Sequence, residues 1–196
     1  MERPADGLNR DGVVLRRWRV DEAGALHRAV AESFDHLVPW MPWAVADYAE
    51  RDALEYLVRA EHEWATGEAF AYRIVAADGV TAGSCSLMAR IGPGGLEIGY
   101  WLRPGYTGRG IATIATAALV DEAFRVGADR VEIVHDAANV RSAAIPARLG
   151  FTEVERLPRG DEPDTRIEVR WRLSARSGPR PGPTPQAPTG RTGCDG

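Results

Sequence analysis

The feature of this sequence that most constrains its fold is a strand that leads through a glycine-rich turn directly into a helix, over residues 97–124. The strand reads EIGYWL, the turn RPGYTGRG, and the apolar residues of IATIATAALVDEAF recur at helical spacing. Glycines let backbone N–H groups approach an anion closely. The first helical turn adds unpaired N–H groups and about half a unit of positive charge. The segment therefore predicts a site for a phosphate or pyrophosphate, or else a tight turn that binds nothing.

Outside this segment the chain alternates predicted strands and helices. The strands are expected over residues 12–19, 69–76, 81–89, 96–102, 130–135, 151–156 and 165–173. The helices are expected from Asp21, from Asp47 to Gly67, from Gly108 to about residue 125, and over residues 140–149. Two Pro-Trp pairs in HLVPWMPW (36–43) predict a stiff aromatic loop. This order predicts a single α/β (α+β) domain over residues 10–173, between a flexible N-terminus (1–9) and a disordered Pro/Gly-rich tail (174–196).

Charge and composition exclude several classes of function. The net charge of −4 argues against nucleic acid as a main partner. No apolar run approaches the roughly 18 residues that a transmembrane helix needs, and the first residues do not resemble a signal peptide. Cys85 and Cys194 are too few for a disulfide framework or a zinc site. We therefore expect a cytoplasmic protein that binds no nucleic acid, no membrane and no metal.

Four segments resemble the GNAT superfamily of N-acetyltransferases, in the order that the superfamily requires. EIGYWLRPGYTGRGIAT is similar to its motif A, particularly in the Rim-type branch that modifies the N-termini of ribosomal proteins, and NVRSAAIPARLGF (139–151) resembles motif B. LVPWMPW and VVLRRWRVDEA resemble the Trp-rich segment and the opening strand of that branch. The resemblance spans about residues 10–173. One position departs from it: Thr107 stands where the superfamily has Gln or Arg, and the register one glycine earlier puts Gly105 there.

The resemblance implies a fold and a cofactor. The fold would be a single GNAT-type domain, with a mixed, mostly antiparallel sheet of about seven strands that splays at the cofactor site and is flanked by helices. The cofactor would be acetyl-CoA, with its pantetheine arm in the splay and its pyrophosphate on the turn. The residues implied to contact it are Trp101, Leu102, Thr107, Gly108, Arg109, Gly110, Ile111, Ala112, Thr113, Asn139 and Ser142.

The resemblance also implies catalytic roles, each with an alternative. Glu97 would be the base, or a solvated glutamate at a strand start. Ser142 would protonate the departing thiolate, or Asn139 would simply cap the helix that contains it. Trp40 and Trp43 would wall the acceptor pocket, or pack in the core.

The other residues with reactive or ionisable side chains are weaker candidates for the functional site. A ping-pong mechanism through Cys85 would require an adjacent histidine, and none is near it in sequence. We therefore interpret Cys85 as a buried strand cysteine. Tyr106 and His135 could serve the site or the fold. The acidic run Asp161, Glu162 and Asp164 could face an acceptor or only solvent.

The acceptor is expected to be the N-terminal α-amine of a protein or peptide. Near neutral pH a lysine amine, with a pKa of about 10.4, costs roughly 4 kcal/mol to deprotonate, whereas an α-amine near 7.7–8.0 costs under about 1 kcal/mol. Direct attack on the thioester then needs little more than positioning. The alternatives are a small-molecule amine such as an antibiotic, a non-catalytic acyl-CoA-binding module, and a nucleotide-binding protein of another fold. Rim-type relatives are often dimers, so a homodimer stays open.

Overall fold

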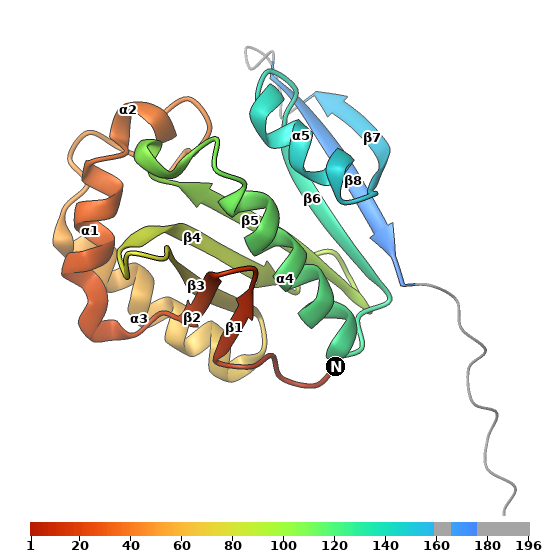
Figure 1. Cartoon of the computed structure of the whole chain (residues 1–196), viewed down its shortest axis with the longest axis horizontal. Helices are drawn as coiled ribbons and strands as arrows, with labels where there is room; N and C mark the ends of the chain where they lie inside the picture. The colour runs from red at the N-terminus through yellow and green to blue at the C-terminus, as the bar shows by residue number, and fades with distance from the viewer. Residues whose placement is uncertain (159–165, 176–196) are drawn as a thin grey trace, which may run out of the picture.

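Figure 1 shows the computed structural model of the chain, which describes residues 1–158 and 166–175. Within those residues eight strands form one sheet in the order β1-β2-β3-β4-β5-β6-β8-β7. Neighbouring strands are antiparallel except for β5 and β6, which are parallel. The strands are β1 (Gly7–Arg10), β2 (Val13–Arg17), β3 (Ala69–Val75), β4 (Thr81–Met88), β5 (Gly95–Leu102), β6 (Arg130–Asp136), β7 (Thr152–Pro158) and β8 (Ile167–Ser174). The expected mixed sheet is confirmed, with one strand more than predicted because residues 7–10 form β1.

Helices cover both faces of the sheet (Figure 1). One face carries α1 (Ala23–Ala31), α2 (Phe34–Leu37) and α3 (Glu50–Thr66), and the other carries α4 (Ile111–Arg125) and α5 (Val140–Arg148). Short 3-10 helices precede α1 and α4, as η1 (Val20–Glu22) and η2 (Pro104–Tyr106). The Trp-rich segment is mostly loop, as predicted, although α2 reaches into its first two residues.

Three predicted helix starts are wrong. The helix expected from Gly108 begins at Ile111, because Gly108 and Gly110 have left-handed φ values that do not fit a right-handed helix. Asp21 lies inside η1 and does not cap α1; the nearby cap bond runs from the Arg19 N–H to Glu22 at 3.0 Å. The helix expected from Asp47 begins at Glu50, because the carboxylate that closes its first turn is Asp52, which accepts a 2.7 Å bond from the backbone N–H of residue 49. The opposite end of α3 follows the prediction, since Gly67 ends the helix in the left-handed conformation with φ 82°.

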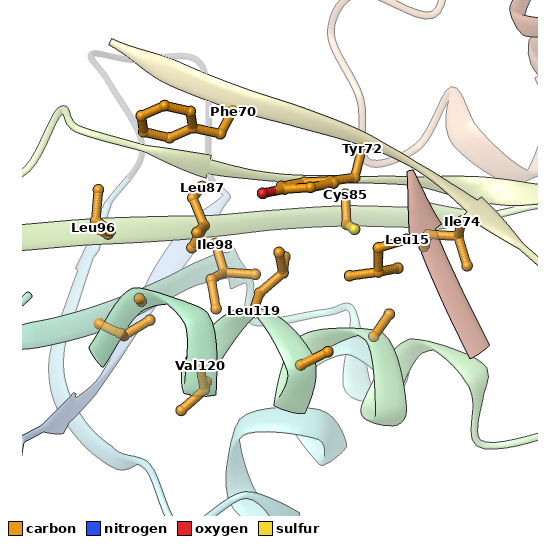
Figure 2. Packing of buried hydrophobic residues seen from close by; sticks show 14 of the residues in the cluster. Leu15, Phe70, Tyr72, Ile74, Cys85, Leu87, Leu96, Ile98, Leu119 and Val120 are labelled. Atoms are coloured by element: carbon orange, nitrogen blue, oxygen red, sulfur yellow. The ribbon is translucent and has the colours of Figure 1, made fainter. Parts of the chain in front are cut away.

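Two buried clusters hold the helices on the sheet. Between the sheet and α4, Leu15, Ile98 and Leu119 are at most 1% exposed and point toward one another (Figure 2). On the opposite face, Leu26 of α1 and Leu57 of α3 pack with Trp18 and Ala71. Full burial of such side chains contributes about 1.5–3 kcal/mol each. The central strands are therefore fixed from both sides, which sets the position of β5 and of the turn that follows it.

The N-terminal residues pack against α4, whereas the sequence predicts a flexible segment over residues 1–9. The carboxylate of Glu122 on α4 is buried and accepts a 2.6 Å bond from the backbone N–H of Ala5. The carbonyl of Ala5 accepts a 2.8 Å bond from the hydroxyl of Tyr72. The same carboxylate accepts two bonds, of 2.7 and 2.8 Å, from the guanidinium of Arg125. The buried charge on α4 thus fixes the segment, which periodicity alone does not reveal.

The last strand runs slightly further than predicted. β8 reaches Ser174, and the N–H of Ala175 donates a 2.8 Å bond to the carbonyl of Asp129. The disordered tail predicted beyond this point, and the acidic candidates Asp161, Glu162 and Asp164, lie outside the described residues. Across the parts of the chain that the structure describes, no helix combines the length and apolarity needed to cross a membrane.

Replacing the buried carboxylate tests the attachment of the N-terminus. We expect Glu122→Gln to lower the free energy of unfolding by about 1.5–3 kcal/mol at pH 7, because the bonds from Ala5 and Arg125 lose their charged acceptor. Urea denaturation measures the change. The control is Asp121→Asn: this carboxylate is 71% exposed and pairs with Arg10 on the surface, so its loss should cost under about 0.5 kcal/mol. Equal costs for the two variants would contradict the assignment.

The loss of unfolding free energy in Glu122→Gln should depend on pH. The hydrogen bonds from Arg125 hold the pKa of Glu122 below its usual value. A carboxyl group whose pKa is lower in the folded chain stabilises the fold above its unfolded pKa of about 4.3, and this stabilisation disappears as the pH falls through the folded-state value. The difference in unfolding free energy between the wild type and Glu122→Gln should therefore be complete at neutral pH and shrink below about pH 4.

Candidate functional site

The parallel pairing of β5 with β6 ends after three residue pairs. Gly95, Leu96 and Glu97 pair with Arg130, Val131 and Glu132. Beyond that point β5 remains paired with β4 as far as Leu102, and β6 remains paired with β8 as far as Asp136. The two strands diverge there (Figure 1). Within the described residues, the backbone groups of the facing edges therefore have no strand partner, and they need another one.

The glycine-rich turn stands beside this divergence, at the start of α4. Gly108 and Gly110 have left-handed φ values of 74° and 77°, which side chains rarely adopt. Gly110 is the N-cap of α4, so the N–H groups of residues 111–113 have no partner within the helix. A Cβ placed on either glycine would meet no described atom within 4 Å. The turn therefore presents converging N–H groups to open space, which is the geometry of an anion site.

The loop before the turn is anchored by Tyr106, one of the weaker candidates. The Tyr106 hydroxyl donates a 2.9 Å bond to Asp78 in the β3–β4 hairpin. Bonds from the backbone N–H of Val80 and from Tyr106 lower the pKa of the Asp78 carboxyl. The guanidinium carbons of Arg103 and Arg109 lie 5.6 and 5.5 Å from the centre of the Tyr106 ring. Tyr106 thus supports the turn and holds Arg109 close to it.

Asn139, Ser142 and Tyr100 meet where α5 faces the end of β5. The Asn139 side-chain oxygen accepts a 3.1 Å bond from the N–H of Ser142, so Asn139 caps α5. The hydroxyl of Tyr100 lies 3.0 Å from Ser142 Oγ and 3.3 Å from its carbonyl oxygen. Sequence reasoning missed Tyr100, although strand alternation placed it on the face opposite Glu97. Burial raises the pKa of Tyr100 to about 12, while the bond to Ser142 acts to lower it.

Glu97 is buried and paired rather than solvated. Its side chain is 7% exposed, and both carboxylate oxygens accept bonds from Arg90, one of them at 3.1 Å. Its register partner Glu132 is 1% exposed and accepts bonds from Arg172. Strand alternation places Glu97 and Trp101 on the face of α1 and α3, because Ile98 packs under α4. Glu97 and Ser142 therefore lie on opposite faces of the sheet.

The structure separates the two tryptophans that the sequence grouped together. Trp43 is 42% exposed, and its ring lies 6.2 Å from the rings of Trp101 and Tyr48. Trp40 is half-buried and lines a cavity of about 390 Å³. The other residues that line it are Pro39, Asp136, Ala137, Ala138, Arg166 and Ile167. Neither tryptophan belongs to the buried core.

Cys85 and His135 have structural surroundings. Burial raises the pKa of the Cys85 thiol, which keeps it protonated and a poor nucleophile. His135 Nε2 accepts a 2.9 Å bond from the indole N–H of Trp171, which fixes Nδ1 as the donor to the carbonyl of Asp136 at 2.8 Å. Both nitrogens of His135 are thus occupied. Among residues 1–158 and 166–175, no three or more His, Cys, Asp or Glu side chains are grouped to hold a metal ion.

The chain is similar to known proteins. Residues 13–152 match the family described as an acetyltransferase (GNAT) domain. YdaF of Bacillus subtilis (strain 168), named a "putative ribosomal N-acetyltransferase", is 41% identical over 58 residues, which are 29% of this chain and 32% of that protein. The chain thus matches about a third of the length of this curated relative.

Three solved structures have a similar fold. The RimL ribosomal L7/L12 alpha-N-protein acetyltransferase in complex with coenzyme A has a TM-score of 0.79 and 22% identity, over 86% of this chain and 97% of that chain. The microcin C7 self-immunity acetyltransferase MccE, in complex with acetyl-CoA and AMP, has a TM-score of 0.78 and 21% identity, over 84% of this chain and 93% of that chain. RimJ of Mycobacterium smegmatis, in complex with CoA-disulfide, has a TM-score of 0.76 and 26% identity, over 89% of this chain and 88% of that chain.

The family match extends from β2 to the first residue of β7, so it includes the diverging strands, the glycine turn and α5. It covers well over half of the chain. The chain therefore belongs to the acetyltransferase (GNAT) domain family.

Proposed function

We propose that this chain is an acetyl-CoA-dependent N-acetyltransferase that acts on the N-terminal α-amine of a protein or peptide. The observation that carries the proposal is the divergence of β5 and β6 beside an N–H-lined turn. The divergence suits a chain of amides that ends in a thioester, and the turn suits a pyrophosphate. One long ligand can contain both parts. The solved structures of similar fold are named as coenzyme A or acetyl-CoA complexes, which supports the same ligand here.

The described residues fit this ligand. The unpaired edge of β5 at Trp101 and Leu102 would satisfy the amides of the pantetheine arm. The N–H groups of residues 108–113 would hold the pyrophosphate, with Arg109 adding a positive charge. The side-chain N–H₂ of Asn139 remains a donor toward the same arm, because only its oxygen serves the helix cap. When bound, acetyl-CoA supplies the thioester whose acetyl group is transferred.

Proton removal and proton donation are assigned to opposite faces of the sheet. On the face of α1 and α3, Glu97 would accept the proton of the incoming amine, directly or through water. A carboxylate has about four acceptor sites, and Arg90 occupies two of them, so acceptor capacity remains. On the face of α4 and α5, Ser142 would donate a proton to the leaving sulfur. This arrangement lets an amine enter from the side opposite the departing thiol.

The acceptor is proposed to enter beside Trp40. The cavity there carries the carboxylate of Asp136, whose Oδ1 accepts a 2.8 Å bond from the N–H of Ala138 and whose other oxygen can attract an ammonium group. An α-amine needs little help to lose its proton at neutral pH. A relative named for alpha-N-protein acetylation supports the same substrate class. A small-molecule amine is the second candidate, because the exposed ring of Trp43 beside Trp101 offers a flat surface for stacking.

Placing a carboxylate in the turn tests the cofactor site. We expect Gly110→Asp to weaken coenzyme A binding by about 100- to 1000-fold, because a like charge about 4 Å from a phosphate costs roughly 4 kcal/mol near a protein surface. Calorimetric titration at moderate salt measures the affinity.

The matched control for this variant is Gly127→Asp. Gly127 also has a left-handed φ, of 93°, and no described atom within 4 Å of an added Cβ, but it follows the opposite end of α4. The control should therefore bear the same backbone strain and keep full affinity. If Gly110→Asp binds as tightly as the control, the pyrophosphate does not lie on this turn.

A peptide with a free N-terminus and one internal lysine tests the acceptor. Incubated with acetyl-CoA at pH 7, it should gain one acetyl group on the α-amine, because lysine is protonated there. Fragment mass spectrometry locates the group, and a peptide with a blocked N-terminus is the control. The enzyme contains no lysine, so it adds no lysine acceptor of its own. Acetylation of lysine alone would reverse the assignment, and coenzyme A binding without transfer to any amine would indicate a non-catalytic module.

A further inference from the structure

Pro146 lies inside α5 and changes the surroundings of Ser142. In a regular helix the carbonyl of Ser142 would accept a bond from the N–H of residue 146. Proline has no N–H, so that bond does not exist. A carbonyl deprived of its helical partner in a part-buried position needs another donor. The hydroxyl of Tyr100, reaching across from β5, lies 3.3 Å from it.

The same hydroxyl also contacts the side chain of Ser142. It lies 3.0 Å from Ser142 Oγ, closer than to the carbonyl. With the bond from the N–H of Ser142 to Asn139, every polar atom of Ser142 has a partner among these two residues. The oxygen of this serine lies within hydrogen-bond distance of a phenol on β5, and either of the two hydroxyls can donate to the other. The oxygen that would face the leaving sulfur is therefore preorganised.

The pair also addresses the weak acidity of serine. An aliphatic hydroxyl loses its proton about as reluctantly as water, whereas a thiol has a pKa of about 8.5. A phenol is the stronger acid, and the pKa of Tyr100 is raised only to about 12. If the negative charge ends on the phenol rather than on the serine, the difference in acidity between the proton donor and the thiol becomes smaller. A hydroxyl pair thus donates a proton more readily than Ser142 alone.

We infer that Tyr100 is a positioning residue that acts through Ser142, orienting its hydroxyl and replacing the proton that it gives to the sulfur. The amine nitrogen bonds to the acetyl carbon as the carbon–sulfur bond breaks. The sulfur takes the proton of Ser142 Oγ, Ser142 takes the proton of Tyr100, and the phenolate regains one from water. The amine releases its own proton on the opposite face, so charge and protons balance. This inference rests on the proposed acetyl transfer.

A purely structural role for Tyr100 makes a different prediction. If the phenol only satisfies the carbonyl that Pro146 orphans, it becomes dispensable once a helical N–H is restored. Pro146→Ala restores that N–H. Tyr100→Phe removes the hydroxyl and keeps the ring. Comparing Tyr100→Phe in the wild-type and Pro146→Ala backgrounds therefore separates satisfaction of the carbonyl from action on Ser142 Oγ.

The experiment measures thiol release from acetyl-CoA, coenzyme A affinity by calorimetry, and melting temperature. We expect Tyr100→Phe to reduce kcat by about 100-fold in both backgrounds, with the KM for acetyl-CoA and the coenzyme A affinity unchanged. Tyr100→Phe should lower the melting temperature only in the background that keeps Pro146. In a Ser142→Ala background Tyr100→Phe should cause no further loss of kcat, since the two hydroxyls act as one unit.

A spectroscopic readout is independent of turnover. The tyrosine ring-carbon signal that Tyr100→Phe removes should shift when coenzyme A binds, because the serine hydroxyl turns from the phenol toward the sulfur. It should not shift in Ser142→Ala. An active enzyme in which Tyr100→Phe keeps full kcat on the Pro146→Ala background, or in which this signal stays fixed, overturns the inference alone. A wild type that neither binds coenzyme A nor releases thiol overturns the proposed function and the inference with it.

Discussion

The early end of the pairing between β5 and β6 is the constraint on which the rest of the site depends. Each strand keeps a full partner on its outer side, β4 for β5 and β8 for β6, so the sheet can open in its middle without fraying. The opening leaves backbone donors and acceptors that water or a ligand must satisfy. It also places the glycine turn after the end of β5 and α5 after the end of β6. A ligand that supplies amides can thus complete the sheet.

The last pair before the opening carries two glutamates side by side. Like charges at paired positions destabilise a sheet, and burial makes the repulsion worse. Here Arg90 neutralises Glu97 and Arg172 neutralises Glu132. The pairing can therefore hold up to this register. The same arrangement leaves Glu97 paired with Arg90 where the shared strand pairing ends, and the proposed chemistry needs an acceptor there.

Local patterns predicted the parts of the fold that depend on local physics. The end of α3 at Gly67 and the strand–turn–helix of the candidate cofactor site both follow from short-range propensity. What the sequence did not show is contact between distant residues. Ala5 meets Glu122 across 117 positions, and Tyr100 meets Ser142 across 42. Periodicity assigns Tyr100, Glu122 and Ser142 to a face of their elements, but it cannot name the partner that the tertiary fold brings there.

The departure at Thr107 shows how the chain keeps its turn without the expected Gln or Arg. The Thr107 hydroxyl donates a 2.8 Å bond to the carbonyl of Pro104, which closes the turn locally. The Tyr106–Asp78 bond then ties that turn to the β3–β4 hairpin. With the backbone held by these two contacts, the proposed anion site would need only the N–H groups of residues 108–113. On this proposal the side chain at position 107 would be replaceable, whereas the turn itself depends on the left-handed φ of Gly108 and Gly110.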